Sequence, residues 1–410
     1  MKKSLLLSLL IFIGILAKAN DLVVEENGIS PSYSSIAAAV AAANTGDRIF
    51  IKNKAGNLPW LENITITKSL SFLAFQYDTF FVVQGQYTIS PSVADTVTII
   101  GMINLNGSIS ATAAAPAGSR SAVRVLNSQF NVGGIYFGYN NYDVMVEGCN
   151  LASGYILYAH GSIIGNQIYN SNGNYAIEVI AESSNTSDTS YIMGNKITSE
   201  ASSNQYGIYW ASSTMCFDIR NNYIQAAYYG LYINPTTSNA VINKVYNNTI
   251  SIANSGQSIN YGIYIASSSG SQVDIQNNVI DRNDAVNYTY YGIYTSNGGT
   301  LTLTYNYVDD GFSYPISGSS TVNLNNVTNT AISLNTNGTT VGGVGVNGGN
   351  PGTSFYDIDL SVNDAGCYGG SFTLNNYSQF SNYPTTWLTN YQFNARSGNT
   401  LNIKANSYSK

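Results

Sequence analysis

A short unit recurs along most of this chain, and it constrains the fold more than any other feature. The unit reads aliphatic, any residue, Gly or Asn, small polar, any residue, aliphatic. Its fourth position is occupied by Ser128, Cys149, Asn166, Asn195, Asn222, Asn248, Asn278 and Asn306, with a weaker copy at Asn325. Successive copies lie 17 to 30 residues apart. Self-similarity at this period indicates a repeat architecture in place of a single globular core.

The third position of the unit predicts a bend. It is Gly or Asn in every copy from Asn127 to Asn277, and it becomes Tyr305 in the next copy. Because Gly and Asn tolerate a left-handed backbone, each unit is predicted to be a strand, a one-residue bend and a second strand. Asparagines just after the bend can bond to their copies in the coils above and below. This predicts a structural ladder of Asn166, Asn195, Asn222, Asn248, Asn278 and Asn306.

A further strand precedes most of the bends, as in Gly207-Ile208-Tyr209-Trp210 and Gly262-Ile263-Tyr264-Ile265. Alternation of apolar residues marks a strand with one buried face. Two or three short strands per repeat then form a solenoid, in which each coil covers the apolar interior of its neighbours. We therefore expect an all-β solenoid of about ten to twelve coils.

A short helix is predicted before the first strands. Residues 34–43 place Ile36, Val40 and Ala43 on one helical face, with Ser34 as the N-cap and Gly46 as the stop. Such a helix can cover the open end of the coil. The expected organisation is a signal peptide (1–19), an N-terminal cap (20–48), β-helix repeats (49–346), a closing segment (347–377) and a C-terminal tail (378–410).

The first residues are typical of a signal peptide. Lys2 and Lys3 precede an apolar run over residues 5–16, and Ala17-Lys18-Ala19 supplies the small residues of a cleavage site. No other apolar stretch approaches the roughly 20 residues of a transmembrane helix. We expect a secreted protein, or one held at the outer cell surface. A formal charge of −6 argues against a nucleic-acid partner.

Three widely spaced cysteines, Cys149, Cys216 and Cys367, match neither a disulfide framework nor a metal cluster. Cys149 occupies an interior position of the repeat. Buried free thiols are therefore expected.

With these units in place, the chain resembles the right-handed parallel β-helix proteins of the pectate-lyase-like superfamily over residues 21–346. A second resemblance lies in Asn347-Gly348-Gly349-Asn350-Pro351, Asp357-Ile358-Asp359 and Asn363-Asp364-Ala365-Gly366-Cys367-Tyr368-Gly369-Gly370. These residues are similar to a closing segment of secreted Bacteroidetes β-helix proteins. The resemblance implies a right-handed coil that ends at this segment and holds polysaccharide on an exposed strand face.

The catalytic groups of that superfamily are not recognisable, and no catalytic residue is assigned. Polygalacturonase-like members combine clustered Asp residues with Gly-His-Gly and a basic tripeptide, whereas here Asp309-Asp310 and the lone His160 occur in reversed order without the basic partner. Pectate-lyase-like members need several carboxylates that hold calcium beside a basic residue, and neighbouring units lack that group. His160 is better explained as a partly buried turn residue. A non-enzymatic role is favoured, with a polysaccharide lyase or glycoside hydrolase as the alternative.

Charges also align before three of the ladder asparagines. Asp218, Lys244 and Asp274 occupy the same offset in successive units. Neighbouring strands lie about 4.8 Å apart, so we expect a surface ladder of alternating charge. Each such pair stabilises the fold by about 0 to 1 kcal/mol.

The closing segment has two interpretations. Asp357, Asp359, Asn363 and Asp364 offer the oxygen ligands that calcium prefers. The alternative is a hydrogen-bonded turn in which Gly366, Gly369 and Gly370 supply the tight bends. Calcium is the only cofactor that the sequence suggests.

The candidate binding site is a column of aromatic residues. If the aliphatic residues of the third strand point inward, alternation sends the tyrosines beside them outward in consecutive coils. The column consists of Tyr209, Tyr232, Tyr264 and Tyr294, extended toward the N-terminus by Tyr136 and Glu178. Sugar rings stack on such aromatic faces, which predicts binding of polysaccharide or a cell-surface glycan, or a role in adhesion. The alternative is that the stacked rings only stabilise the sheet.

Overall fold

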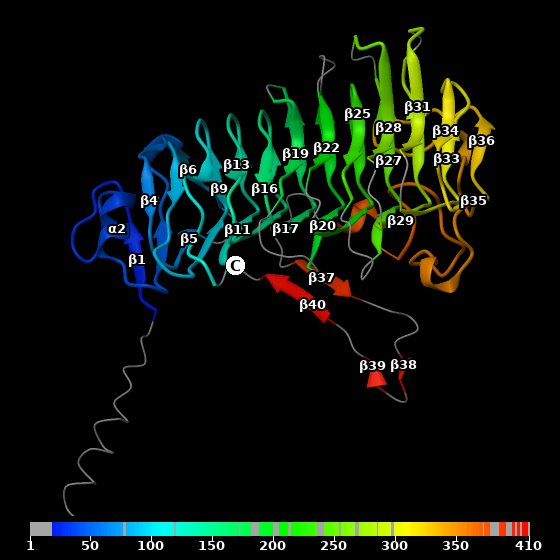
Figure 1. The fold of residues 1–410 in the computed structure, drawn as a ribbon. Coiled ribbons are helices and arrows are strands. Elements are labelled where there is room, and N and C mark those ends of the chain that lie inside the picture. Colours follow the sequence, from blue (N-terminus) through cyan, green and yellow to red (C-terminus); the bar gives the residue numbers. More distant parts are fainter. Residues whose placement is uncertain are drawn as a thin grey trace, which may run out of the picture.

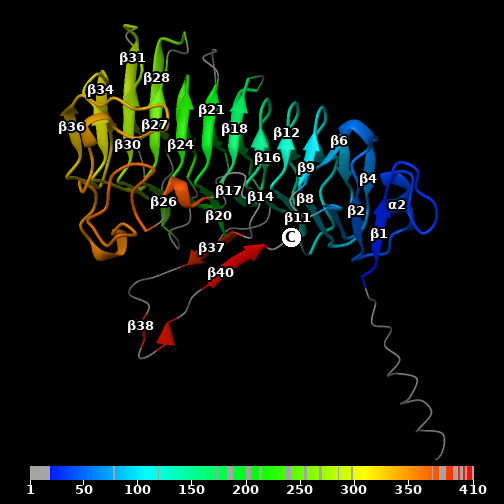
Figure 2. The ribbon, with the colours of Figure 1, turned by 180° about the vertical axis from the view of Figure 1, so that it is seen from behind.

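Three short strands per repeat wind the chain into a right-handed parallel β-helix, seen from the side in Figure 1 and from behind in Figure 2. The computed structural model describes residues 19–377 except 77–78, 119, 172, 182–187, 200–204, 212–214, 236–241, 254–255, 267–269, 285, 297–298 and 372, and then residues 385–390, 396–397, 400–401 and 404–408. The strands form eleven complete coils, within the predicted range. The all-β solenoid prediction is confirmed.

Each coil contributes one strand to each of three parallel sheets. The first sheet has 13 strands, which run up to the bend: β1 (Asp21–Val24), β2 (Arg48–Ile51), β5 (Leu70–Ala74), β8 (Thr96–Ile100), β11 (Ser121–Leu126), β14 (Tyr142–Glu147), β17 (Gly161–Ile164), β20 (Thr189–Met193), β23 (Cys216–Arg220), β26 (Asn243–Tyr246), β29 (Gln272–Gln276), β32 (Thr300–Thr304) and β35 (Val322–Leu324). β1 belongs to this sheet although its residues were expected in the N-terminal cap.

The second sheet has 12 strands, which follow the bend and face the viewer in Figure 2: β3 (Trp60–Leu61), β6 (Phe81–Gln84), β9 (Met102–Asn104), β12 (Gln129–Phe130), β15 (Asn150–Leu151), β18 (Gln167–Asn170), β21 (Lys196–Ser199), β24 (Tyr223–Ala226), β27 (Thr249–Ile252), β30 (Val279–Arg282), β33 (Tyr307–Asp309) and β36 (Val327–Thr330).

The third sheet has 11 strands and faces the viewer in Figure 1: β4 (Ile64–Ile66), β7 (Tyr87–Ile89), β10 (Ile109–Ala111), β13 (Ile135–Phe137), β16 (Ile156–Tyr158), β19 (Tyr175–Val179), β22 (Tyr206–Trp210), β25 (Tyr229–Ile233), β28 (Ile259–Ile265), β31 (Thr289–Thr295) and β34 (Tyr314–Gly318). After the coil come the antiparallel pairs β37 (Thr385–Asn390) with β40 (Lys404–Tyr408), and β38 (Arg396–Ser397) with β39 (Thr400–Leu401).

The N-terminal helix is α2 (Ile36–Ala42), and its cap differs from the prediction. The N-cap is Ser35, not Ser34: the Oγ of Ser35 accepts a hydrogen bond from the backbone N of Ala38 at 3.1 Å. The carboxylate of Glu62 accepts two more helix donors, from the backbone N of Ile36 at 2.9 Å and of Ala37 at 2.8 Å. A carboxylate at this end satisfies donors that have no partner within the helix. α2 lies at the first end of the coil (Figure 1).

The bends adopt the predicted left-handed backbone. Asn221, Asn247 and Asn277 have φ of 53°, 52° and 57°, and the glycine at the same position of an earlier unit, Gly194, has φ of 62°. Tyr305 also adopts φ of 57°, which is rare for a bulky residue.

The asparagines after the bends form a continuous buried ladder. In each step the Oδ1 of one asparagine accepts hydrogen bonds from both the backbone N and the Nδ2 of the previous one; for Asn248 and Asn278 these distances are 2.9 and 3.0 Å. The same Nδ2 also donates to a backbone carbonyl, as the Nδ2 of Asn248 does to the carbonyl of Ile219. The same pattern joins Asn166, Asn195, Asn222, Asn248, Asn278 and Asn306.

The ladder residue of the ninth copy is Asn326, one position after the predicted Asn325. Asn325 is the bend, with φ of 57°, and Asn326 accepts the ladder hydrogen bonds from Asn306. The Nδ2 of Asn326 donates to Oδ1 of Asn323 at 2.7 Å, where earlier members donate to the next asparagine. Asn323 thus terminates the ladder.

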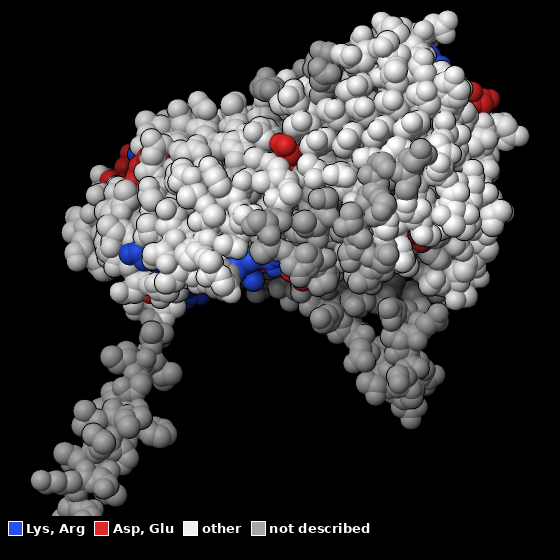
Figure 3. All heavy atoms as spheres, in the orientation of Figure 1, with Lys and Arg blue, Asp and Glu red and all other residues white. Residues whose placement is uncertain are grey.

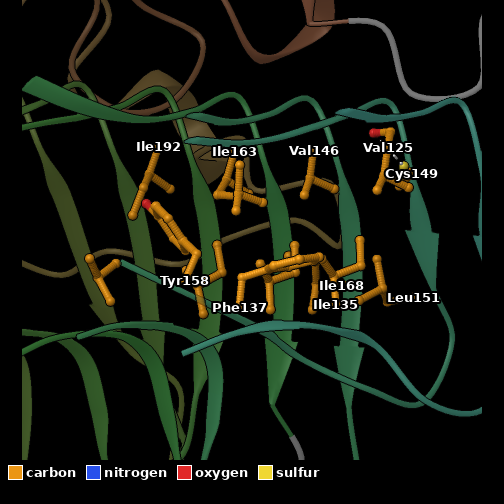
Figure 4. Close-up of a cluster of buried hydrophobic side chains, with 14 of the residues drawn as sticks. Val125, Ile135, Phe137, Val146, Cys149, Leu151, Tyr158, Ile163, Ile168 and Ile192 are labelled. Atoms are coloured by element: carbon orange, nitrogen blue, oxygen red, sulfur yellow. Dashed lines mark hydrogen bonds between the residues drawn. The ribbon is translucent and has the colours of Figure 1, made fainter. Parts of the chain in front are cut away.

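The interior is filled by aliphatic and aromatic side chains stacked in columns (Figure 4). Val125, Val146, Ile163 and Ile192 follow one another along the first sheet, and all are fully buried. Cys149, Cys216 and Cys367 are buried free thiols, as predicted. No helix among the described residues is both long and apolar enough to cross a bilayer.

The closing segment does not end the coil. The last strand of the coil is β36, so the repeats stop at Thr330 and not at residue 346. The closing segment instead runs back along the flank, where it meets the bend residues in reverse order. The Nδ2 of Asn247 donates to Oδ1 of Asn363, and the Nδ2 of Asn221 donates to the carbonyl of Gly369 at 2.8 Å.

The two ends of the closing segment extend this path. The backbone N of Asn350 donates to Oδ1 of Asn277 at 2.8 Å. The ring of Tyr377 covers Gly194, where an added Cβ would lie only 1.9 Å from the ring. The remaining short helices are η1 (Ala55–Asn57), η2 (Val341–Gly343), η3 (Thr353–Phe355) and η4 (Leu374–Asn376).

Candidate functional site

The outer face of the third sheet carries the predicted aromatic residues in strict register. Tyr209, Tyr232, Tyr264 and Tyr294 pair directly across β22, β25, β28 and β31. Ile208, Leu231, Ile263 and Ile293 beside them are fully buried. These four tyrosines are called the first tyrosine column.

A second tyrosine column lies beside the first and was missed in the sequence. Its members pair in register across β19 to β34 and are Tyr175, Tyr206, Tyr229, Tyr261, Tyr291 and Tyr314. The signal was present as Tyr-Gly-aliphatic-Tyr, for example Tyr261-Gly262-Ile263-Tyr264. Strict alternation would send residues three apart to opposite faces, so the first tyrosine of each motif was not assigned to the outer face.

The glycine and the aliphatic residue after it are both buried, so the two tyrosines of the motif flank a pair of inward-facing residues and lie on the same outer face. In Gly207, Gly230 and Gly262, an added Cβ would lie 2.5 to 2.7 Å from the carbonyl oxygen of the next glycine along the column. It would also lie within 2.6 Å of an aliphatic side chain of the second sheet. The strands therefore approach so closely that only glycine fits.

The rings stack on one another along the columns. Tyr232 and Tyr264 are 5.0 Å apart at an interplanar angle of 9°, and Tyr229 and Tyr261 are 4.8 Å apart at 5°. Within each coil the two columns meet edge to face, as for Tyr261 and Tyr264 at 5.1 Å and 84°. Ring faces within the columns are thus largely covered by neighbouring rings, which corrects the expectation of aromatic faces free to stack on sugars. Ring edges and phenol hydroxyls remain for a ligand.

Burial raises the pKa of several phenols in the two columns. The pKa of Tyr261 is raised to about 12, first by burial and then by the neighbouring tyrosines. Burial also raises the pKa of Tyr232 and Tyr264. At neutral pH the hydroxyls are therefore uncharged, and each can both donate and accept a hydrogen bond.

Tyr136 and Glu178 share the outer column but are not continuous with each other. Leu157 lies between them, because Tyr136 pairs with Leu157 and Leu157 pairs with Glu178. Tyr136 packs instead on Tyr155, with ring centroids 4.5 Å apart. Glu178 pairs directly with Tyr209, and burial raises the pKa of its carboxyl.

The proposed calcium ligands are held by hydrogen bonds within the protein. Oδ1 of Asp357 accepts the backbone N of Gly370 at 2.5 Å, and Oδ1 of Asp359 accepts the backbone N and Oγ of Ser361. Asn363 bonds to Asn247, and Oδ1 of Asp364 accepts the backbone N of Asn347 at 2.6 Å. These contacts are those of the turn interpretation. Among the described residues, no cluster of three or more His, Cys, Asp or Glu side chains is arranged to hold a metal.

The histidine and the aspartate pair considered for catalysis lie apart. Nδ1 of His160 is 2.8 Å from Oδ1 of Asp143, and its side chain is 14% exposed. Asp309 is buried on the second sheet, where Oδ1 accepts the backbone N of Gly311 and Oδ2 accepts that of Ile332. Asp310 is exposed. No shared catalytic centre is formed by these residues.

One carboxyl beside Asp309 was missed. Asp281 occupies the adjacent position of β30, where it is 4% exposed and accepts a hydrogen bond from Oγ of Ser251 at 3.1 Å. Burial, with a smaller contribution from the charge of Asp309, raises the pKa of Asp281 to about 6. The sequence places these two aspartates one repeat apart, which was the available signal.

The charge column on the first sheet has the predicted register but different partners. Asp218, Lys244 and Asp274 pair across β23, β26 and β29. Asp218 forms an ion pair with Arg220 of its own strand, and Asp274 accepts hydrogen bonds from the hydroxyl of Tyr246 and from Gln276. Residues two apart on one strand face the same side, so Arg220 and Gln276 reach Asp218 and Asp274 from the same strands, whereas Tyr246 reaches Asp274 from the neighbouring strand.

Comparison with known proteins places few constraints on function. No protein-family model matches the chain, and no curated protein matches it. Among solved structures it is similar to "Crystal structure of pectate lyase Pel9A", with 15% sequence identity and a TM-score of 0.46 over 87% of this chain and 97% of that chain.

Proposed function

We propose that the protein is a secreted or cell-surface β-helix that binds polysaccharide, without catalysis, along the two tyrosine columns of the third sheet. The observation that carries the proposal is the register of ten tyrosines over six neighbouring strands, β19 to β34. Such a surface is extended and regular, as a long polymer is. Many weak contacts in a row give useful affinity for a polymer even when each is weak.

Hydrogen bonding is the proposed mode of contact. Within the columns the ring faces pack on other rings, as for Tyr232 and Tyr264, so the polymer meets hydroxyls and ring edges. Neutral phenols complement sugar hydroxyls as both donors and acceptors. Neighbouring strands repeat about every 4.8 Å, so equivalent hydroxyls recur along the axis of the coil.

Conservative variants test this directly. Tyr232→Phe with Tyr264→Phe keeps the stacked rings and removes two hydroxyls. Retention in affinity gels that contain a panel of polysaccharides should fall about tenfold for the polymer that the wild type binds. Tyr169→Phe, at a 39% exposed tyrosine of the second sheet, is the matched control and should bind like the wild type. Unchanged retention of the double variant would refute the role of the columns.

A second candidate, a polysaccharide lyase or glycoside hydrolase, has one observation in its favour. Asp281 and Asp309 are adjacent carboxyls, and the pKa of Asp281 is raised to about 6, as in general acids. Against it, both are buried and Asp309 has both oxygens engaged. Release of unsaturated or reducing ends from the same panel would favour this candidate, and Asp281→Asn should then abolish it.

Secretion is part of the proposal and rests on the N-terminal sequence, which lies outside the described residues up to residue 18. The mature protein should begin at Asn20. Mass spectrometry of protein recovered from the expressing cell and its medium would reveal any other start.

A further inference from the structure

The third sheet is almost without charge. Across its eleven strands Glu178 is the single charged side chain, and the surface above these strands shows few charged atoms in Figure 3. Glu178 faces outward at the end of the first tyrosine column, paired with Tyr209. Its negative charge raises the pKa of Tyr175 and of Tyr155, after the larger contribution of burial. The third sheet therefore carries one negative charge near its middle, at the N-terminal end of the first tyrosine column, and no cation along its strands.

The cations of the same coils lie on the other two sheets. Between residues 173 and 320 the sequence has four basic residues. Arg220 and Lys244 belong to β23 and β26 of the first sheet, and Lys196 and Arg282 belong to β21 and β30 of the second sheet. Arg220 is paired with Asp218, and Arg282 donates to the carbonyls of Gly311 and Val286.

We propose that the tyrosine face, the outer face of the third sheet that carries the two tyrosine columns, binds uncharged polysaccharides in preference to polyuronates and other polyanions. This inference rests on the proposed glycan-binding function and names the class of polymer. A polyuronate carries a carboxylate on each sugar, and bringing these against partly buried tyrosines removes water from the charges without supplying a cation. Glu178 repels the same charges at short range. The formal charge of −6 on the whole chain opposes a polyanion at long range.

Neutral polysaccharides meet none of these costs. Their hydroxyls match the phenols of the two columns, which are uncharged at neutral pH and can both donate and accept hydrogen bonds. The selectivity therefore depends on the lack of cations along the strands of this face as much as on its phenol hydroxyls. Specificity by an unfavourable contact with the wrong ligand is a general device of recognition.

A matched pair of polymers tests the inference. Polygalacturonate and its fully methyl-esterified form share one backbone and differ in charge, so retention is compared in affinity gels, with a mixed-linkage β-glucan and a galactan as further neutral probes. We expect the wild type to be retarded by the esterified form, or by another neutral probe, at least about tenfold more than by polygalacturonate. Glu178→Gln should narrow that difference, and added salt should narrow it as well.

The outcomes separate the two proposals. Retention by polygalacturonate equal to or above that by neutral polymers overturns the charge selection and leaves glycan binding in place. Retention by no probe of either class overturns both. Unchanged discrimination in Glu178→Gln at low salt removes Glu178 from the argument and contradicts the electrostatic cause, and circular dichroism of the variant checks that the coil is intact.

Discussion

Truncation of one ladder asparagine, Asn248→Ala, should destabilise the coil by an amount that the hydrogen bonds predict. Oδ1 of Asn248 accepts from the backbone N of Asn222 at 3.1 Å and from its Nδ2 at 2.9 Å. Asn222 is fully buried, so water cannot replace the lost acceptor. A buried donor left without a partner costs about 1–3 kcal/mol. Two such donors give an expected loss of about 2–6 kcal/mol in the free energy of unfolding.

The effect should be local, because each coil of a solenoid contacts only its neighbours. Native-state hydrogen exchange is therefore the assay, and the reporter is the backbone amide of Asn222. A loss of at least about 2 kcal/mol corresponds to exchange roughly 30-fold faster, since 1.4 kcal/mol is a factor of ten. Asn329→Ala, at an exposed position of β36, is the matched control and should leave this amide unchanged.

A second variant distinguishes hydrogen bonding from loss of volume. Asn248→Asp keeps the shape and the Oδ1 acceptor, but it replaces the Nδ2 that donates to the carbonyl of Ile219 and to Oδ1 of Asn278. It also buries a charge, so it should destabilise at pH 7 at least as much as alanine does. The account of the ladder would be refuted if Asn248→Ala cost no more stability than Asn329→Ala. It would also be refuted if Asn248→Asp cost less stability than Asn248→Ala.

Three further predictions concern the tyrosine face and the buried carboxyl. Tyr232 makes ring contacts with four tyrosines, each worth about 0.5–1.5 kcal/mol, so Tyr232→Ala should cost about 2 kcal/mol or more in urea unfolding whereas Tyr232→Phe should cost little; equal costs would contradict the stacking argument. Gly262→Ala places a Cβ 2.5 Å from the carbonyl oxygen of Gly292, so it should lower the melting temperature and cost about 1–3 kcal/mol, and a neutral result would mean that the strands can separate. For Asp281 the pKa is raised to about 6 in the folded protein, so its contribution to stability is present below about pH 4 and is lost as the pH rises through 6. Asp281→Asn should therefore be more stable than the wild type at pH 7.5, by about 3 kcal/mol, and should match it near pH 4; a difference that does not change with pH would show that the shift is not the cause.

The repeat alone was enough to predict the coil, because a one-residue left-handed bend and an asparagine ladder leave few alternatives. The off-by-one errors had a local cause. Asn325 and Asn326 are identical residues, and so are Ser34 and Ser35, so composition could not say which member adopts the bend or the cap.

Only the first of the two tyrosine columns was predicted, and the cause differs from that of the one-residue errors. The alternation rule holds for Ile263 and Tyr264 but fails at Gly262, because Gly262 and Ile263 are consecutive residues that are both buried. The ring stacking then follows from register between coils, which depends on loop lengths that the repeat does not fix. The path of the closing segment was also beyond prediction, because it bonds to residues more than 100 positions away, such as Asn221 and Asn247.

That path has a consequence for how the protein can change in length. The closing segment contacts Asn277, Asn247, Asn221 and Gly194 in turn, which is one bend residue in each of four consecutive coils. The spacing of its own residues is therefore matched to the spacing of these four coils. If a coil were inserted or deleted between β20 and β29, the residues of the closing segment would no longer lie opposite the bend residues that they contact. The coils between β2 and β14 precede the four coils that the closing segment contacts, so we expect duplication or loss of a whole coil to be tolerated there first.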